Sequence, residues 1–134
     1  MIRYLLDTDI CIFFFRKKYD IRDRIAAAGQ GACFVSEITL AELFAGMYKS
    51  GQLEKRHQEL VALLGLVSVV PIREALPIYG RERARLEKLG TPVADFDLLI
   101  ATSAVYHDMV LVTNNTEHHA RVADLRLENW VQPT

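Results

Sequence analysis

The stretch Ile2-Arg3-Tyr4-Leu5-Leu6-Asp7-Thr8-Asp9 opens the chain with an apolar run, broken only by Arg3, that ends in two acidic residues. Such a run is typical of a strand that is buried on both faces of a parallel sheet. Ligands of these sheets bind beyond the carboxyl ends of the strands, so Asp7 is expected to project into a functional crevice. The alternative is that Asp7 only caps the helix that follows it.

Strands and helices are expected to alternate along the rest of the chain. Four further strands are expected at 32–35, 66–70, 109–113 and 125–130. Helices are expected around residues 12–14, fading near the basic Arg16, and at 20–28, 36–49, 52–64, 74–89 and 95–106. This alternation predicts an α/β fold with a mostly parallel sheet flanked by helices.

The length and composition of the chain limit the classes of protein it can belong to. A chain of 134 residues has the size of one domain, so residues 1–134 are expected to form a single domain. No apolar run approaches the roughly 20 residues needed to cross a bilayer, and the N-terminus lacks the features of a signal peptide. We therefore expect a soluble cytoplasmic protein with no membrane partner. Cys11 and Cys33 lack metal-site spacing and are expected to be buried reduced thiols.

The charge balance does not mark the whole chain as a nucleic-acid binder. The sequence has 16 Lys and Arg against 17 Asp and Glu, so any RNA binding must come from local patches. Basic residues cluster at 16–18 and again on the helix that carries Arg81, Arg83 and Arg85. These three arginines are weak candidates for RNA contacts, and a solvated helix face explains them equally well.

Asp97 is a candidate site residue because of its position on the expected helix at 95–106. At about 100° per residue it shares a face with Ile100, Ala101 and Ala104, so its carboxylate is expected to point inward. A buried carboxylate needs a metal ion or hydrogen-bond donors to offset its desolvation. Asp95 falls on another side of the helix and is expected to be an N-cap or an outer group of the site.

Periodicity alone does not select Glu42. It lies opposite the bulky stripe of its helix, which consists of Leu40, Leu43, Phe44 and Met47. Thr39 and Glu42 also have the spacing of a capping box. The neighbours Ala41, Ala45 and Gly46 are small, so this side could lie against the sheet while the bulky stripe packs on a second subunit.

Polar residues follow the expected strand at 109–113. Thr113 and Asn115 lie at its carboxyl edge, where Asn115 could orient water or coordinate an ion, or simply form a turn. His118 and His119 are expected to be surface or RNA-contacting residues rather than metal ligands, since adjacent side chains rarely face the same way.

Carboxylates at the ends of different strands form a site of hard oxygen ligands, which suits Mg²⁺ or Mn²⁺ rather than zinc. A cation of this kind can polarise a phosphodiester and promote its hydrolysis by water. The sequence contains no phosphate-binding glycine loop and no G-x-S-x-G nucleophile motif. Metal-dependent hydrolysis is therefore the favoured chemistry.

Four segments in order along the chain resemble the motifs of VapC-type toxins, which are PIN-domain ribonucleases. They are LLDTDICI at 5–12, SEITLAELFAG at 36–46, DFDLLIA at 95–101 and VTNN at 112–115. The resemblance covers nearly the whole chain. It implies a three-layer α/β/α PIN-like domain with a central sheet of about five strands.

The resemblance also implies a function and assigns residues to it. The chain would be the toxin of a type II toxin-antitoxin system, a homodimeric Mg²⁺- or Mn²⁺-dependent endoribonuclease inhibited by a VapB-type antitoxin. Its RNA substrate would be a tRNA, with initiator tRNA cut in the anticodon stem-loop. Asp7 and Asp97 would bind the metal and Glu42 would supply a further catalytic acid. Asn115 stands where the family often has Asp, which favours one metal ion over two, and Asp95 matches a variable position.

Two other classes of protein remain open at this point. Asp7 and Asp9 after the first strand also fit a phosphatase of the haloacid-dehalogenase type, with Asp7 as nucleophile and Asp9 as acid/base, although Cys11 departs from that pattern. A receiver domain would need a lysine after the last strand, which 113–115 lack. A non-enzymatic RNA- or protein-binding module, in which the acids are only helix caps, is the other alternative.

Overall fold

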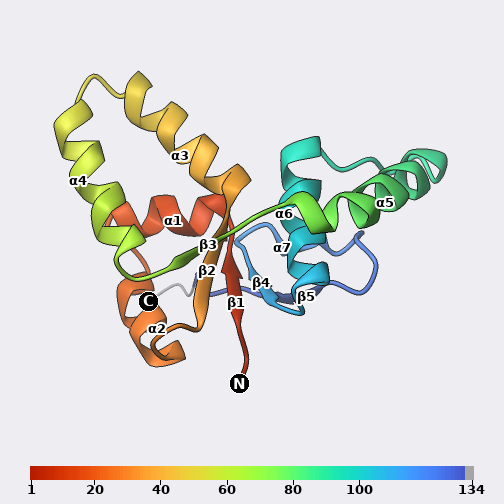
Figure 1. Cartoon of the computed structure of the whole chain (residues 1–134), viewed down its shortest axis with the longest axis horizontal. Helices are drawn as coiled ribbons and strands as arrows, with labels where there is room; N and C mark the ends of the chain where they lie inside the picture. Colours follow the sequence, from red (N-terminus) through yellow and green to blue (C-terminus); the bar gives the residue numbers. More distant parts are fainter. Residues whose placement is uncertain (132–134) are drawn as a thin grey trace.

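A computed structural model describes residues 1–131 and shows a five-stranded sheet with the strand order β3-β2-β1-β4-β5 (Figure 1). The strands are β1 (Tyr4–Leu6), β2 (Cys33–Ser36), β3 (Ser68–Val70), β4 (Val110–Val112) and β5 (Arg126–Glu128). Every neighbouring pair in this sheet is parallel. The predicted α/β class with a parallel sheet of about five strands is confirmed.

Helices cover both faces of the sheet. In chain order they are α1 (Thr8–Phe15), α2 (Ile21–Ala28), α3 (Glu37–Lys49), α4 (Leu53–Leu64), the 3₁₀ turn η1 (Arg73–Ala75), α5 (Leu76–Lys88), α6 (Asp95–Tyr106) and α7 (Thr116–His119). Figure 1 shows α1 to α4 on one side of the sheet and α5 and α6 on the other. The fold therefore has the three layers that the resemblance implied.

Two apolar cores follow from the alternation of side chains along β1. Leu6 packs into a core with residues of α1 to α4, such as Ile10 and Leu63. Its neighbour Leu5 packs into a second core with Leu98 and Ile100 of α6. Successive side chains of a strand point to opposite faces, so one apolar run supplies both cores. This explains why the opening stretch of the sequence carries so much information about the fold.

The order in which strands are added to the sheet reverses at β1. Strands β2 and β3 lie on one side of β1, whereas β4 and β5 lie on the other. A crevice forms beyond the carboxyl ends of the strands where the strand order reverses in this way. The backbone N–H of Asp7 donates to the carbonyl of Val112 at 2.9 Å, so the ends of β1 and β4 are held together.

The structure corrects two predictions about α3. Its N-cap is Ser36, whose hydroxyl accepts from the N–H of Ile38, so Thr39 and Glu42 do not form a capping box. The small side of the helix does not lie against the sheet, because Ala41, Ala45 and Gly46 are exposed. The core instead takes the bulky Leu43 and Met47, whose burial removes more apolar surface from water.

Cys11 and Cys33 are both buried and unpaired, as predicted, and burial raises the pKa of the Cys33 thiol to about 11. Helix α7 was not predicted. None of the helices in residues 1–131 has the length and apolar content that a membrane crossing requires.

Candidate active site

Asp7 occupies the crevice beyond β1 and is buried, with 5 % of its surface exposed. Its Oδ1 accepts a 2.9 Å hydrogen bond from the N–H of Thr8, so it caps α1 as well. Its Oδ2 accepts a 2.8 Å hydrogen bond from the hydroxyl of Thr113, which follows β4. Asp7 is therefore both the N-cap of α1 and a carboxylate of the crevice.

Asp97 reaches the same crevice from the first turn of α6. Its side chain is 38 % exposed, while Ile100, Ala101 and Ala104 on the same helix are fully buried. Asp97 thus lies at the solvent edge of the apolar face that its position predicted. One of its oxygens, Oδ2, lies 3.6 Å from Nε2 of His118.

His119 joins the two aspartates, which contradicts its prediction as a surface residue. The short helix α7 places it in the interior, with 1 % of its surface exposed. One ligand atom from each of Asp7, Asp97 and His119 lies within 4.8 Å of the others. The described residues therefore bring together two carboxylates and one imidazole, a set that could hold a metal ion.

Glu42 lies beside this cluster but is not a member of it. Its Oε1 accepts a 2.7 Å hydrogen bond from the hydroxyl of Thr8, the residue that follows Asp7. The same hydroxyl lies 3.0 Å from that of Thr39 on α3. Helix α3 thus connects Glu42 to Asp7 through one intervening residue, although the helical periodicity did not select it.

Asp9 contributes a further buried acid next to Asp7. Its Oδ2 accepts a 2.9 Å hydrogen bond from the N–H of Asn114, and its buried Oδ1 has no partner within residues 1–131. Burial raises the pKa of the Asp9 carboxyl, and the neighbouring Asp7 carboxylate raises it further. Asp9 was expected to be functional only in a phosphatase, although its position two residues after Asp7, in the first turn of α1, already placed it near Asp7.

Thr113 and Asn115 shape the crevice in different ways. Thr113 is fully buried and directs its hydroxyl at Asp7, while that hydroxyl also accepts from the N–H of Asn115 at 3.1 Å. Asn115 itself is exposed and contributes its backbone, since its carbonyl lies 3.0 Å from Nδ1 of His119. Asn115 therefore positions other groups through its main chain.

Asp95 lies outside the cluster, and its prediction as an N-cap is wrong. The N-cap of α6 is Ala94, so Asp95 stands inside the first turn. Its Oδ1 accepts a 2.7 Å hydrogen bond from the hydroxyl of Tyr79 and lies 2.9 Å from Nε of Arg83. Both side chains of the ion pair are about half exposed. Asp95 thus joins α6 to α5 at the surface.

The basic face of α5 has partners within the molecule. Arg83 pairs with Asp95, and Arg85 donates two hydrogen bonds to the buried Glu82 and a third to the carbonyl of Arg121. Arg81 is exposed. Two of the three weak candidates for RNA contacts are therefore engaged in stabilising the packing of α5.

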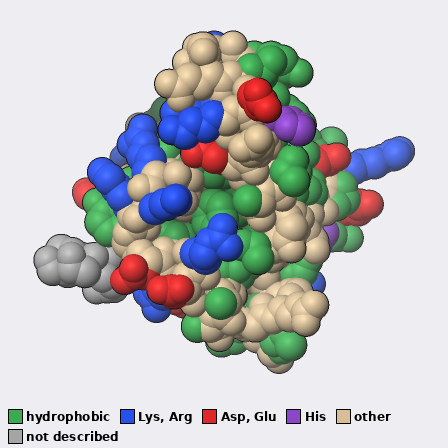
Figure 2. Space-filling view, turned by 90° about the vertical axis from the view of Figure 1, so that its left-hand side faces the viewer, with side chains coloured by type: hydrophobic (Ala, Val, Ile, Leu, Met, Phe, Trp, Pro, Cys, Tyr) green, Lys and Arg blue, Asp and Glu red, His purple; other side chains and the backbone are tan. Residues whose placement is uncertain are grey.

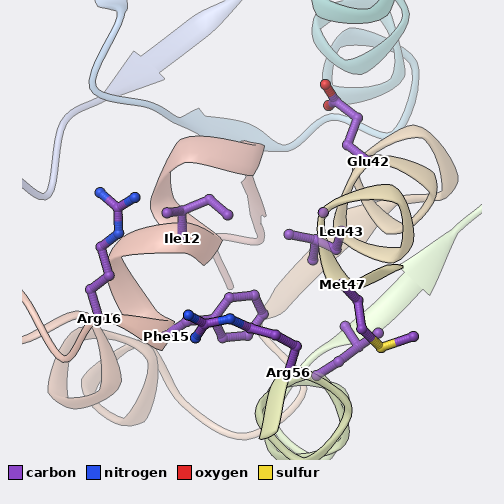
Figure 3. A pocket seen from close by; sticks show the side chains of 9 residues that line it. Ile12, Phe15, Arg16, Glu42, Leu43, Met47 and Arg56 are labelled. Atoms are coloured by element: carbon purple, nitrogen blue, oxygen red, sulfur yellow. The ribbon is translucent and has the colours of Figure 1, made fainter. Parts of the chain in front are cut away.

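An apolar pocket of about 190 Å³ opens between α1, α3 and α4 (Figure 3). Its walls are Ile12, Phe15, Leu43, Met47 and Leu60, and polar ends are provided by Arg16, Glu42 and Arg56. Figure 3 shows Glu42 at one end of the pocket, with Phe15 and Arg56 toward the other. The pocket thus begins at a residue of the candidate active site.

A wider basic groove continues from this pocket between α4 and the α1–α2 connection. Phe15, Arg16 and Arg56 line both, and six of the fourteen residues that line the groove are basic: Arg16, Lys17, Lys18, Arg22, Lys55 and Arg56. Three are acidic, so the groove has a formal charge of +3 in a chain whose net charge is −1. On the side of the molecule that carries α2 and α4, Lys and Arg side chains surround an apolar hollow (Figure 2).

The connection between α1 and α2, which lines part of this groove, has several residues with positive φ angles. Lys17, Tyr19 and Asp20 have φ angles of 57°, 59° and 54°, in the left-handed region that residues other than glycine seldom adopt. Such conformations require support from the surrounding structure and are concentrated at functional segments. The ring of Tyr19 packs on that of Phe13 at a centroid distance of 4.9 Å.

Comparison with known families defines the class of this protein. The profile of the PIN domain family matches residues 4–125, which include β1, the acidic crevice and α7. The five parallel strands and the crevice acids are thus those of a PIN-domain protein.

Curated relatives give the narrower assignment. The chain is 36 % identical over 132 residues to the tRNA(fMet)-specific endonuclease VapC of Shigella flexneri, which covers 97 % of this chain and 99 % of the relative. It is 34 % identical to ribonuclease VapC2 of Rickettsia felis, over 95 % of this chain and 97 % of the relative. The chain belongs to the VapC ribonucleases of the PIN-domain family.

Solved structures agree with this assignment. The crystal structure of VapBC2 from Rickettsia felis bound to a DNA fragment from their promoter has a chain with a TM-score of 0.90 and 32 % identity, covering 97 % of this chain and 99 % of that one. The DNA-bound VapBC from Salmonella typhimurium has a TM-score of 0.90 and 33 % identity, with the same coverage. Membership in this family excludes the phosphatase, receiver-domain and non-enzymatic alternatives.

Proposed function

We propose that this ribonuclease is the toxin of a type II toxin-antitoxin system and hydrolyses tRNA with a divalent cation, Mg²⁺ or Mn²⁺, held by Asp7 and Asp97. The observation that carries the proposal is the convergence of these two carboxylates from β1 and α6 on one crevice, within 4.8 Å of each other. Two carboxylates this close repel each other unless a cation or proton lies between them.

The donor set fits a hard divalent cation. Carboxylate oxygens are the ligands that Mg²⁺ and Mn²⁺ prefer, and Mg²⁺ is commonly held by only one or two protein carboxylates together with water. Asp7 is fixed by Thr8 and Thr113, while Asp97 lies at the solvent edge, where substrate and water have access. When bound, the cation would stabilise the negative charge that develops on the phosphodiester during hydrolysis.

The chain's own residues would position the reactants. Thr113 and the N–H of Thr8 hold the two oxygens of Asp7 in one orientation, which pre-organises the site. Glu42 is the proposed proton acceptor for the attacking water. Its Oε1 is occupied by the hydroxyl of Thr8, which leaves Oε2 for that proton. No direct contact with the cation or the reacting water is proposed for Asp95, Thr113 or Asn115. These residues would act by holding other residues in place.

The proposed RNA path runs along the basic groove into the apolar pocket. The groove is positively charged, so it suits a phosphate backbone, and it is continuous with the pocket that Glu42 lines. The pocket of about 190 Å³ is smaller than the roughly 300–1,000 Å³ of small-molecule sites, so it would take only part of a larger ligand. An unpaired base stacked on Phe15 is the proposed occupant, because bases stack on aromatic rings.

The proposed substrate is initiator tRNA, cut in its anticodon stem-loop. The relatives from Shigella flexneri and Salmonella typhimurium, at 36 % and 34 % identity, are both tRNA(fMet)-specific endonucleases. An anticodon loop presents unpaired bases, which the pocket beside Phe15 could accept. RNA contacts from Arg81, Arg83 and Arg85 remain a secondary proposal, since Arg83 and Arg85 are engaged within the molecule.

The proposed partners are a VapB-type antitoxin and a second copy of the chain. The similar solved structures from Rickettsia felis and Salmonella typhimurium are VapBC complexes, which supports an antitoxin partner. On α3, Phe44 and Tyr48 lie one turn apart and are 39 % and 71 % exposed. Exposed aromatic residues on one helix face favour a protein interface, and we assign this face to the homodimer.

Cleavage of initiator tRNA by the purified full chain tests the proposal. With Mn²⁺ present, Asp97→Asn is expected to lower the rate at least about 100-fold, because it removes anionic ligand charge. Asp124→Asn is the matched control, since Asp124 is exposed and has a left-handed backbone that Asn accepts. Wild-type cleavage by the Asp97→Asn variant, or cleavage unaffected by EDTA, would overturn the proposal.

A further inference from the structure

The two ring nitrogens of His119 have very different surroundings. Nδ1 lies 3.0 Å from the backbone carbonyl of Asn115, one helical turn earlier. Nε2 is buried, has no hydrogen-bond partner within residues 1–131, and lies 3.7 Å from Oδ2 of Asp7. An orphaned polar atom in the interior is uncommon and calls for a missing partner.

The carbonyl of Asn115 decides which nitrogen carries the proton. A carbonyl oxygen can only accept, so Nδ1 must donate, and the neutral ring then presents a lone pair at Nε2. Oδ2 of Asp7 already accepts from Thr113 and presents its remaining lone pair. Two electron-rich atoms thus face each other at 3.7 Å in a buried site, which is unfavourable without a positive charge between them.

The third member of the cluster identifies that charge as a metal ion. A proton on Nε2 would serve Asp7 alone, whereas Asp97 also offers an oxygen to the cluster, in which one ligand atom of each of the three residues lies within 4.8 Å of the others. Ligand atoms of an octahedral ion with bonds of about 2.1 Å lie about 3.0 Å apart when adjacent and about 4.2 Å apart when opposite. The 3.7 Å between Nε2 and Oδ2 lies between these two spacings, so the pair would have to move closer together to become adjacent ligands.

We propose that Nε2 of His119 is the third protein ligand of the divalent cation, beside Asp7 and Asp97. This inference rests on the proposed function, which places the cation at the two aspartates. The hydrogen bond from Nδ1 to Asn115 holds the ring in the required tautomer, as is usual for metal-binding histidines. An imidazole nitrogen in the ligand set favours Mn²⁺ over Mg²⁺, because Mg²⁺ prefers an all-oxygen environment.

Electron paramagnetic resonance of the full chain loaded with Mn²⁺ tests the proposal without any activity measurement. The spin echo of bound Mn²⁺ is expected to show modulation from a directly coordinated ¹⁴N nucleus. His119→Phe, which keeps a ring in the buried position, should abolish the modulation and weaken Mn²⁺ binding at least about tenfold. His118→Phe removes the other imidazole near the cluster, whose Nε2 lies 3.6 Å from Oδ2 of Asp97, and it should retain the modulation.

A second measurement addresses the choice of metal. His119→Asp, which exchanges the nitrogen for an oxygen, is expected to narrow the ratio of Mn²⁺ to Mg²⁺ affinity measured by calorimetry. If wild-type protein binds Mn²⁺ without ¹⁴N modulation, His119 is not a ligand, while the site at Asp7 and Asp97 stands. If wild-type protein binds no Mn²⁺, both this inference and the metal of the proposed function fail. The spectra of the wild type and of His118→Phe, in which His119 is the histidine left beside the cluster, decide the question even where His119→Phe does not fold.

Discussion

The hydroxyl of Thr113 donates a 2.8 Å hydrogen bond to Oδ2 of Asp7, and 106 residues separate the two in the sequence. They meet because β1 and β4 are parallel neighbours, with Leu6 paired to Val112 at their carboxyl ends. The bond is fully buried, so it controls the direction of the Asp7 carboxylate and not only its stability.

Removal of this hydrogen bond should impair catalysis more than folding. Thr113→Val keeps the shape of the side chain but leaves Oδ2 of Asp7 without its donor. We expect tRNA cleavage to fall about 10- to 100-fold and the free energy of unfolding to fall by about 1–3 kcal/mol. Cleavage kinetics and urea unfolding measure the two effects. Thr113→Ser restores the hydroxyl and should recover most of the rate, and an unaltered rate in Thr113→Val would remove Thr113 from the site.

Asp95 and Asp97 should differ sharply although they are two residues apart. Asp95 pairs with Arg83 at the surface, where such ion pairs contribute about 0–1 kcal/mol. We expect Asp95→Asn to cleave tRNA within about twofold of the wild-type rate under conditions where Asp97→Asn is inactive. A parallel loss of cleavage in Asp95→Asn would show that the carboxylate reaches the cation or the RNA.

Glu82 should make stability depend on pH. Its hydrogen bonds from Arg85 lower the pKa of this buried carboxyl, and the N–H of Ala123 lowers it further. A lowered pKa in the folded state stabilises the protein above the unfolded value of about 4.3, and this contribution is lost as the pH falls through the folded value. Glu82→Gln should therefore lower the free energy of unfolding by about 1.5–3 kcal/mol at pH 7.

The pH dependence separates this charge effect from simple packing. The difference between Glu82→Gln and wild type should shrink as the pH falls from about 4 through the lowered pKa of folded Glu82, because both side chains are neutral below that pKa. Urea unfolding at pH 7 and at several acidic pH values measures it. A difference that stays constant with pH would mean that Glu82 contributes through its shape alone.

The basic groove can be tested through the salt dependence of RNA binding. Arg16→Gln combined with Lys55→Gln removes one charge from each wall of the groove. In an Asp97→Asn background, which prevents cleavage, we expect weaker tRNA binding. The slope of log K against log salt should decrease in size by about 1.4–1.8, at roughly 0.7–0.9 for each phosphate that the variant no longer neutralises. Fluorescence anisotropy at several NaCl concentrations gives both quantities.

A matched pair of substitutions provides the control for the groove. Arg73→Gln combined with Lys88→Gln also removes one Arg and one Lys, both exposed, from η1 and α5 on the other side of the sheet. Its salt slope should equal that of the wild type. If the groove variant binds tRNA normally but no longer binds a VapB-type antitoxin, the groove is a protein-docking surface and the proposed RNA path is wrong.

The sequence predicted the architecture well because the apolar periods are clear. All five strands occur within two residues of their expected bounds, since short β-branched runs between turns have few alternatives. The 3₁₀ turn before α5 was not anticipated, and the helix expected at 74–89 runs from Leu76 to Lys88 after it. Helix α7 has four residues, too few to show any periodicity, so no helix was expected there.

The candidate site was less predictable because tertiary contacts decide it. Strand-end position selected Asp7 and wheel angle selected Asp97, and the structure brings both to one crevice. Glu42 faces Thr8, a contact that depends on how α3 crosses α1 and that no periodicity of one helix contains. His119 was misplaced for the same reason as α7, because adjacent histidines gave no sign that one ring would be buried.

The position of β4 and α7 late in the chain has a consequence for synthesis. Asp7 leaves the ribosome early, but Thr113 and His119 emerge only when translation of the domain is almost complete. Until then the crevice lacks one wall, and the strand that must align beside β1 does not yet exist. A nascent chain of this toxin would thus lack a complete crevice until β4 and α7 have emerged and packed beside β1.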